Sequence, residues 1–277
     1  MNLPLTQRVL QTNWHAACFP GPPMKTTSQK KIYAHLIGSL SFLVAGCNAN
    51  GMGSGNILAK WNSADSGFTP LPVQDTVLPV ADGTSTAAKV WDTQLTQPHA
   101  GIVFVTGVDG GFIEPVDGIY QRLADTLEQE GVDSVFVQYR QPGVVDPSVQ
   151  DALAGVNYLR THHVDRMAIV GWSFGGATIT NTAPQVPEIV TLIGFSPQSK
   201  DTEAAALLKP YQSVLLFHSH DDDNVPFGAS QEILDETPAE NHKMFVPLEG
   251  YDHFLTGAQN QVDPVALSWL KKELLGE

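Results

Sequence analysis

The chain has 277 residues, of which 42% are hydrophobic and 16% are charged, as in an ordinary globular protein that can bury a core without disulfides or a structural metal. The formal net charge of −14 argues against a basic surface of the kind that binds nucleic acid. The two cysteines, Cys18 and Cys47, form no CxxC pair, so the sequence offers neither a dithiol redox motif nor a thiolate zinc site.

Residues 24–47 have the order of an export signal. Lys25, Lys30 and Lys31 form a basic start, and residues 32–45 form an apolar run interrupted by His35. This run has the length of a signal-peptide core and is short for a membrane span. The segment that follows, Val44-Ala45-Gly46-Cys47, resembles the lipobox of bacterial lipoproteins, in which small residues precede the cysteine that becomes the lipidated N-terminus.

This resemblance implies a signal peptide over 24–46 and a lipid anchor at Cys47, on a protein of the bacterial envelope that faces the periplasm or the exterior. The alternatives are a secreted protein and a buried N-terminal helix with an incidental cysteine. Met24 fits as the start of such a signal, so residues 1–23 are interpreted as an upstream extension, with Met1 as the alternative start. The glycine- and asparagine-rich opening of residues 47–67 predicts a flexible linker.

From residue 68 onward, strand-like and helix-like segments alternate. Apolar runs predict strands over 75–80, 87–93, 101–106, 134–139, 167–171, 189–195, 213–218 and 243–248. Helical periodicity predicts helices over 116–130, 146–162, 174–182, 230–236 and 264–275. The alternation predicts one α/β domain over 68–277, with a mainly parallel sheet that helices cover on both faces.

The strongest local feature is Gly171-Trp172-Ser173-Phe174-Gly175, which fits the pattern G-x-S-x-G between a predicted buried strand and a predicted helix. That context is the one a nucleophile elbow requires, because side chains at the two glycines would collide across so tight a turn. The serine is then held at a helix N-terminus, where unpaired N–H groups can stabilise an oxyanion. The pattern predicts Ser173 as nucleophile, Gly171 and Gly175 as elbow residues, and the Phe174 N–H as an oxyanion donor.

Two later segments offer an acid and a base. Residues 218–226 (HSHDDDNVP) resemble the H-G-x-x-D-x-x-V-P stretch that follows the seventh strand of many α/β-hydrolases, with Ser219 in place of the glycine. The resemblance assigns the acid to Asp222 rather than its neighbours Asp221 and Asp223; a solvated turn or an incidental cation site is the alternative. His253 stands in a G-x-x-H-F arrangement between the last strand and the last helix, which matches the family order of serine, acid and histidine.

The second oxyanion donor is expected in residues 106–112 (TGVDGGF), a glycine-rich loop whose backbone can approach a reacting carbonyl. Many α/β-hydrolases have His-Gly at its start, whereas this chain has Thr106-Gly107. We predict the Val108 N–H as the donor, with Asp109 as the alternative. The remaining alternative is that residues 106–112 form an ordinary strand-to-helix turn that supplies no oxyanion donor.

The resemblance to the α/β-hydrolases spans about residues 75–275 and implies hydrolysis of esters through an acyl-enzyme, without a metal or an organic cofactor. Residues 196–212 leave room for a helix but not for a lid, so we expect an open site similar to those of dienelactone-hydrolase-like and small carboxylesterase members. Dienelactone hydrolases carry cysteine at the position of Ser173, which argues against that specific activity. Three aromatic side chains are candidates for lining the substrate pocket: Phe112, Phe227 and Phe254.

The expected partners are a small-molecule ester and, through the anchor, a membrane. A peptidase or an acyltransferase of the same fold is the first alternative, weakened by the lack of a propeller or cap domain. A non-catalytic envelope-binding lipoprotein on a hydrolase scaffold is the second. It is weakened because serine, acid and histidine are all present.

Overall fold

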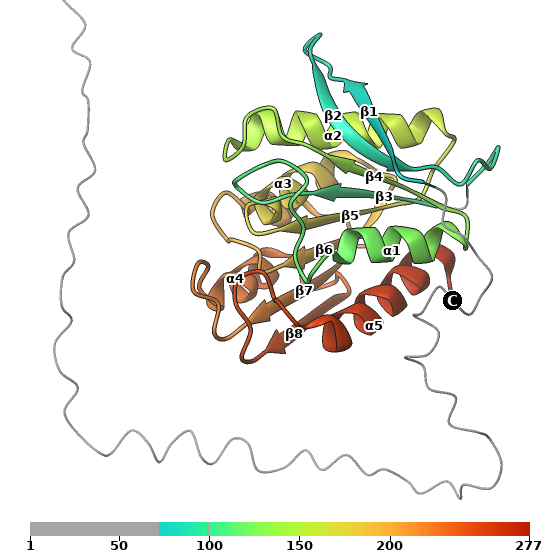
Figure 1. Ribbon diagram of the computed structural model, residues 1–277. Coiled ribbons are helices and arrows are strands. Elements are labelled where there is room, and N and C mark those ends of the chain that lie inside the picture. The colour runs from blue at the N-terminus through green and yellow to red at the C-terminus, as the bar shows by residue number, and fades with distance from the viewer. Residues whose placement is uncertain (1–71, 99) are drawn as a thin grey trace, which may run out of the picture. The chain divides into compact units, whose positions relative to one another are not determined.

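The computed structural model describes residues 72–98 and 100–277, which form the domain in Figure 1. The predicted upstream extension (1–23), signal peptide (24–46), lipidated Cys47 and linker (47–67) all lie outside the described residues. Within the described ranges, no helix combines the length and the apolar character needed to cross a membrane.

The centre of the domain is an eight-stranded sheet with the order β1-β2-β4-β3-β5-β6-β7-β8. The first two strands form an antiparallel hairpin, and β2 pairs with β4 in antiparallel register. All other neighbours are parallel. The strands are Gln74–Pro79 (β1), Ser85–Trp91 (β2), Ala100–Val105 (β3), Val132–Val137 (β4), Met167–Trp172 (β5), Ile189–Phe195 (β6), Ser213–Ser219 (β7) and Lys243–Leu248 (β8).

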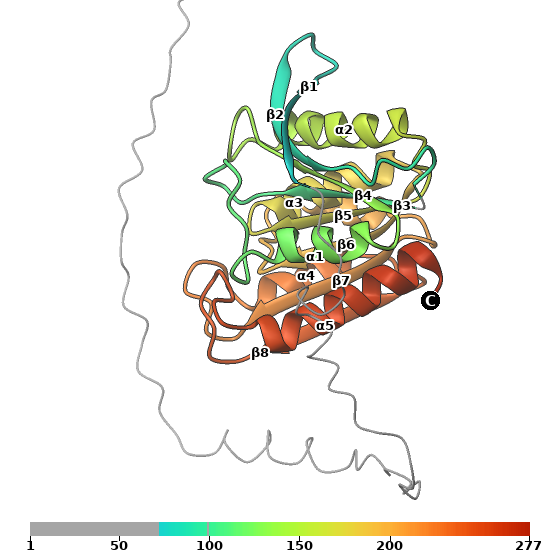
Figure 2. The ribbon, with the colours of Figure 1, turned by 45° about the vertical axis from the view of Figure 1, so that its right-hand side comes forward.

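Helices cover both faces of this sheet (Figures 1 and 2). One face carries α1 (Ile119–Glu128) and α5 (Gln259–Leu270), and the other carries α2 (Val145–Thr161), α3 (Gly175–Thr182) and α4 (Gly228–Glu236). The predicted α/β fold with a mainly parallel, doubly covered sheet is therefore confirmed.

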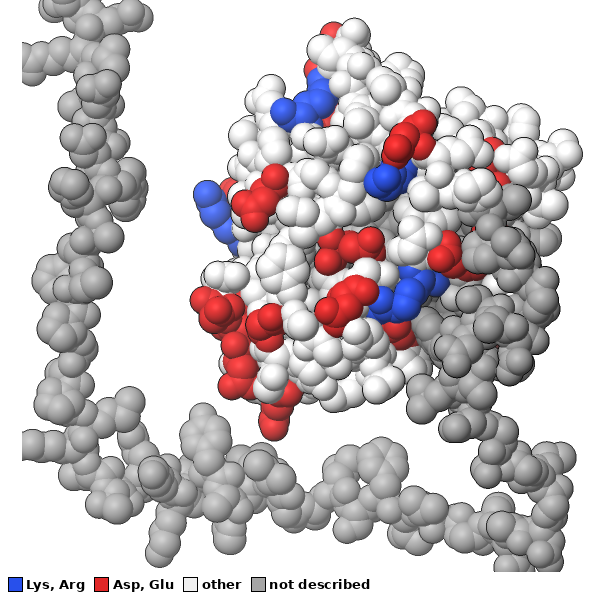
Figure 3. All heavy atoms as spheres, viewed as in Figure 1, with Lys and Arg blue, Asp and Glu red and all other residues white. Residues whose placement is uncertain are grey.

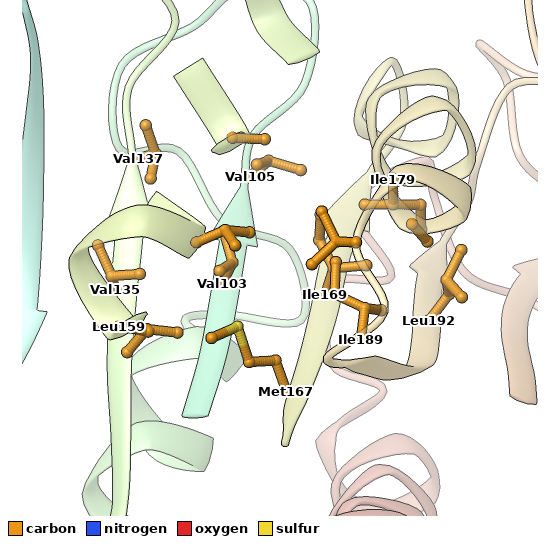
Figure 4. Close-up of a cluster of buried hydrophobic side chains, with 14 of the residues drawn as sticks. Val103, Val105, Val135, Val137, Leu159, Met167, Ile169, Ile179, Ile189 and Leu192 are labelled. Carbon is orange, nitrogen blue, oxygen red and sulfur yellow. The ribbon is translucent and has the colours of Figure 1, made fainter. Parts of the chain in front are cut away.

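The five central strands are buried at every residue, which explains their continuous apolar runs. Successive side chains enter opposite cores, because the side-chain period of a strand is two. Val103 and Val105 point into the cluster under α2 and α3 (Figure 4), whereas Ile102 and Phe104 join the cluster under α1 and α5.

The start of the first predicted helix differs from the sequence-based expectation. Val116, Asp117 and Gly118 have φ values of 51°, 48° and 92°, and α1 begins only at Ile119. The Val116 N–H donates to the Phe254 carbonyl across the fold (2.8 Å), so a tertiary contact holds these residues outside the helix.

The last predicted helix also differs, because α5 begins at Gln259 and places Pro264 inside the helix. A proline there removes one helical hydrogen bond, which costs about 3 kcal/mol in an isolated helix. Val262, Ala266 and Leu270 lie one turn apart and are buried against the sheet, and this burial outweighs the proline. A π-helical turn, Lys271–Leu275, follows.

The connection between β6 and β7, which leaves room for a helix, contains only a 3₁₀ turn, Glu203–Leu207. Only Ala205 of this turn is fully buried, so the segment lacks the apolar stripe that stabilises an α-helix. The connection carries no inserted domain over the edge of the sheet where β5, β6 and β7 end.

Candidate active site

Ser173 lies in the turn between β5 and α3 and has a left-handed backbone conformation, with φ 56°. This conformation is unfavourable for a residue with a Cβ and is kept only where the surroundings enforce it. The Ser173 N–H donates to the Phe195 carbonyl (3.0 Å), and the Ser173 carbonyl accepts from the N–H groups of Gly176 (2.9 Å) and Gln198 (3.1 Å). The strained turn is thereby fastened to the end of β6.

The two elbow glycines have no room for a side chain. A Cβ at Gly171 would lie 2.6 Å from the Gly175 carbonyl oxygen, and one at Gly175 would lie 2.9 Å from the Thr106 carbonyl oxygen. Both obstacles are backbone atoms, which cannot rotate away as a side chain can. The close approach is what presses the serine turn above the sheet edge.

His253 joins the serine to a carboxylate 49 residues further along the chain. Its Nε2 lies 2.9 Å from the Ser173 Oγ, and its Nδ1 lies 2.8 Å from the Asp222 Oδ2. The Ser173 and His253 residues are only 7% and 5% exposed. When Nδ1–H donates to the carboxylate, Nε2 is left as an acceptor for the serine hydroxyl, and this arrangement can remove the serine proton.

The Asp222 carboxylate is surrounded by donors. Its Oδ1 accepts from the N–H groups of Asn224 and Val225, both at 2.8 Å, and its Oδ2 contacts His253 and also His218 Nε2 at 3.2 Å. Burial acts to raise the pKa of this carboxyl, but the hydrogen bonds from His218, His253 and the two backbone groups outweigh it and hold the pKa well below its usual range. The carboxylate therefore stays ionised beside the imidazole.

The structure distinguishes the three consecutive aspartates. Asp221 is exposed and accepts from the Gly250 N–H (2.6 Å), and Asp223 is exposed to solvent. Of these three described residues, only Asp222 contacts His253. The acidic run is therefore more than a solvated turn, although its outer two members do face solvent.

The loop after β3 passes directly beside the serine. A Cβ at Gly107 would lie 2.7 Å from the Trp172 ring and 3.4 Å from the Ser173 Cβ. Thr106, which stands where many relatives have histidine, donates its hydroxyl to the Ile113 carbonyl (2.8 Å) and so closes the loop on itself. Among the described residues, the N–H groups of Phe174, Val108 and Asp109 have no acceptor, so both the predicted loop donor and its alternative are available to a bound oxygen.

The three candidate aromatic residues lie in different surroundings. Phe254 is 37% exposed and packs on the Trp172 ring at 4.3 Å, beside His253. Phe227 stacks on the His220 ring at 3.6 Å in the segment that follows the acid. Phe112 packs edge-on against Phe136 of the buried core (5.3 Å), with the Lys89 ammonium 5.1 Å from its ring centroid.

Among the described residues, one group of three has side chains placed to hold a metal ion. The ligand atoms of Asp92, Asp133 and His162 all lie within 4.8 Å of one another. Asp133 is near the start of β4, so the group lies at the opposite edge of the sheet from Ser173. The Thr93 N–H (2.9 Å) and His162 Nδ1 (3.1 Å) already satisfy the buried Asp133 carboxylate without an ion.

Sequence reasoning treated His218 only as the opening residue of the acid motif and did not consider Ser230 as part of the site. The structure places His218 Nε2 against Asp222 and His218 Nδ1 2.8 Å from the Ser230 Oγ. The sequence signal for this contact is the short spacing of four residues between His218, near the end of β7, and Asp222, in the loop that follows it.

Solved structures show the same fold. The esterase domain of a Rhodothermus marinus protein is 16% identical, with a TM-score of 0.60, and the match covers 73% of this chain and 99% of that one. Est1E from Butyrivibrio proteoclasticus is also 16% identical, with a TM-score of 0.61 and coverage of 73% and 99%. An acylaminoacyl peptidase from Pyrococcus horikoshii is 15% identical, with a TM-score of 0.60. The match covers 75% of this chain but only 42% of the peptidase.

Comparison with curated protein sequences finds no match. The family model described as "Dienelactone hydrolase family" matches residues 106–260, a segment that contains Ser173, Asp222 and His253. Because this segment is more than half of the 277 residues, the chain belongs to the dienelactone hydrolase family.

Proposed function

We propose that this protein is a serine hydrolase that cleaves carboxylic esters, with Ser173 as nucleophile, His253 as general base and Asp222 as the acid of the triad. The observation that carries the proposal is the unbroken series of hydrogen bonds from the serine Oγ through the imidazole to an ionised carboxylate. A serine hydroxyl is a weak nucleophile at neutral pH, and a neighbouring oriented imidazole is what activates it.

In the proposed reaction, the Ser173 Oγ attacks the ester carbonyl while its proton moves to His253 Nε2. The carbonyl oxygen becomes an oxyanion, held by the N–H groups of Phe174 and Val108. Collapse of this intermediate breaks the bond to the alcohol, which takes the proton from His253 and leaves. Water, deprotonated by His253, then attacks the acyl-enzyme and releases the carboxylic acid. Asp222 holds the ring and stabilises its positive charge throughout.

Exposed apolar side chains beside the serine favour an ester with an apolar acyl or alcohol group. Val108, which is 53% exposed, follows Gly107, the residue that lies against Trp172 and Ser173. Phe254, which is 37% exposed, packs on the Trp172 ring. The rim of the site also carries exposed acidic residues, and Figure 3 shows acidic side chains gathered over the loops that follow β7 and β8. These charges disfavour anionic substrates. The exposed acidic residues of these loops are Asp221, Asp223, Glu249 and Asp252.

The test is hydrolysis of a chain-length series of p-nitrophenyl esters by the purified protein, with Ser173→Ala and the exposed Ser85→Ala as a matched pair. We expect the first variant to lose at least about 1,000-fold in kcat, and the second to keep wild-type activity. A peptide p-nitroanilide series run in parallel tests the peptidase alternative. Esterase activity that survives Ser173→Ala contradicts the assignment of the nucleophile. Hydrolysis of anilides without esters contradicts the assignment of the substrate class.

We also propose that the protein is held at the bacterial envelope by a lipid on Cys47. Support comes from the order of basic residues, apolar run, small residues and cysteine over 24–47. Expression in a bacterial host with Cys47→Ala tests this, with Ser54→Ala in the predicted linker as control. We expect the first variant to leave the membrane fraction and the second to stay in it. Equal membrane association of the two variants contradicts the anchor.

A further inference from the structure

A second histidine contacts the same carboxylate oxygen as the proposed base. His218 is the last residue but one of β7, and its Nε2 lies 3.2 Å from the Asp222 Oδ2, the atom that His253 Nδ1 approaches to 2.8 Å. The side chains of His218 and Asp222 have no exposed surface. His218 thus reaches the carboxylate from inside the protein and has no access to a substrate.

The neighbours of His218 decide which ring nitrogen carries the proton. Its Nε2 faces two acceptors, the Asp222 carboxylate and the Val225 carbonyl oxygen at 3.1 Å. A bare nitrogen lone pair there would face only other lone pairs, so Nε2 carries the hydrogen. In the neutral ring Nδ1 is then an acceptor, and the buried Ser230 hydroxyl, 2.8 Å away on α4, donates to it.

The result is a symmetrical series of side chains in which one carboxylate lies between two serine–histidine pairs. We infer that His218 is a positioning residue: with Ser230 fixing its tautomer, it anchors the Asp222 Oδ2 so that the carboxylate holds His253 toward Ser173. This inference rests on the proposed function of the triad. It adds a second serine–histidine pair, Ser230 and His218, buried on the inner side of the carboxylate. The geometry of the first pair, Ser173 and His253, depends on it.

Hydrogen-bond counting explains why the carboxylate needs this anchor. An ionised carboxylate has about four acceptor positions, and a buried one is costly unless donors fill them. Donors reach both oxygens of Asp222: the N–H groups of Asn224 and Val225 approach Oδ1, and the two histidine rings approach Oδ2. The His218 N–H is shared between Oδ2 and the Val225 carbonyl oxygen. Without His218, only the His253 ring would hold Oδ2. The carboxylate could then turn about its bond to the backbone, and the imidazole would turn with it.

The chain offers a matched pair of substitutions at this position. In His218→Gln the side-chain amide reaches the place of Nε2, so it can still donate to Asp222. In His218→Asn the shorter amide reaches only the place of Nδ1, so it keeps the contact with Ser230 and loses Asp222. Both variants replace a buried ring with a smaller amide. A purely structural role for the ring would therefore lower activity similarly in both.

The measurement is kcat and KM for the best p-nitrophenyl ester, with the full chain and with active sites counted by a fluorophosphonate probe. We expect His218→Asn to lower kcat about 10- to 100-fold, the effect of losing one hydrogen bond to a charged group, with KM within about twofold of wild type. His218→Gln should recover most of that loss. Equal losses in both variants, or a wild-type kcat in His218→Asn, would overturn the inference.

Ser230→Ala keeps the inference testable if both His218 variants fail to fold, because it removes only one hydroxyl. We expect kcat to fall about threefold to tenfold at unchanged KM, the effect of losing one neutral hydrogen bond. An unchanged kcat in Ser230→Ala contradicts the role of the inner pair. Ser173→Ala is measured alongside to separate this outcome from failure of the proposed function. That variant stays active only if Ser173 is not the nucleophile.

Discussion

Two segments carry Ser173 and Asp222, and they are held in different ways. They are the serine elbow between β5 and α3 and the acid loop between β7 and α4. In the elbow, backbone atoms press so closely on Gly171 and Gly175 that no side chain fits. In the acid loop, the Asp222 carboxylate is fixed by two backbone N–H groups and two histidine rings, although Asp221 and Asp223 on either side of it are exposed. The elbow therefore depends on steric exclusion, whereas the acid loop depends on charge and hydrogen-bond donors.

This difference predicts different failures. A change in the elbow should lower the stability of the fold, because a collision between an added Cβ and a backbone oxygen cannot be relieved by rotating a side chain. A change in the acid loop should leave the fold intact and remove activity, because the loop contributes a charge to the site.

The largest effect is expected from Asp222→Asn, which removes the charge from the centre of the proposed triad. We expect kcat to fall about 10,000-fold, because an amide neither holds the required tautomer of His253 nor stabilises its positive charge. Steady-state kinetics check this, with circular dichroism to show that the variant is folded. Asp223→Asn is the matched control, and we expect its kcat within about threefold of wild type. A similar loss in both variants would mean that the acidic run acts only through its overall charge.

In the elbow, Gly171→Ala should lower the free energy of unfolding by about 3 kcal/mol, because its Cβ would lie 2.6 Å from a backbone oxygen. Gly228→Ala is the control, since a Cβ at this first residue of α4 meets no atom within 4 Å. We expect Gly228→Ala to be neutral or to stabilise the protein by about 0.5 kcal/mol. Urea unfolding of both variants measures the difference, and equal stability of the two would contradict the steric account of the elbow.

Low pH should weaken the acid loop. The pKa of Asp222 is held below its usual range, so its contribution to stability is present above the unfolded-state value of about 4 and is lost as pH falls. About 1 kcal/mol should be lost by pH 3 relative to pH 7, a loss that Asp222→Asn lacks. Urea unfolding of both proteins between pH 3 and pH 7 measures this. Parallel stability curves would show that the carboxylate is not stabilised in the folded protein.

High pH should weaken the support of the elbow. Tyr139 is buried, donates to the Thr178 Oγ1 on α3 (2.8 Å) and packs edge-on against Phe174 (5.7 Å). Burial raises the pKa of Tyr139, so its contribution to stability is present below the unfolded-state value of about 10 and is lost as pH rises. We expect a loss of about 0.8 kcal/mol by pH 10.5 in wild type that is missing from Tyr139→Phe. Identical pH dependence of the two proteins would contradict this assignment.

How much of the site could be predicted from the sequence follows from the same contrast. The elbow has a local signature at Gly171, because the collision that demands glycine there is with Gly175, four positions along the chain. At Gly175 the obstacle is the Thr106 carbonyl oxygen, which only the fold brings near. The strands could also be located, since burial on both faces requires a continuous apolar run. The acid loop has three aspartates in succession, and only a resemblance to known hydrolases favoured the middle one. The role of His218 was not predicted, because nothing near it in the sequence points to Ser230.

Patterns within the sequence indicated the α/β fold and the G-x-S-x-G turn, because burial of whole strands and the collision between positions 171 and 175 act over short stretches of chain. The predicted order of serine, acid and histidine rested on the resemblance to known hydrolases. The tertiary structure decided which oxygen of which aspartate meets His253, 31 residues further along the chain. It also decided that α1 begins after a contact between Val116 and Phe254, and that α5 tolerates Pro264. These outcomes depend on burial and hydrogen bonds between segments that the packed sheet brings together, and such contacts leave no periodic or local pattern in the chain.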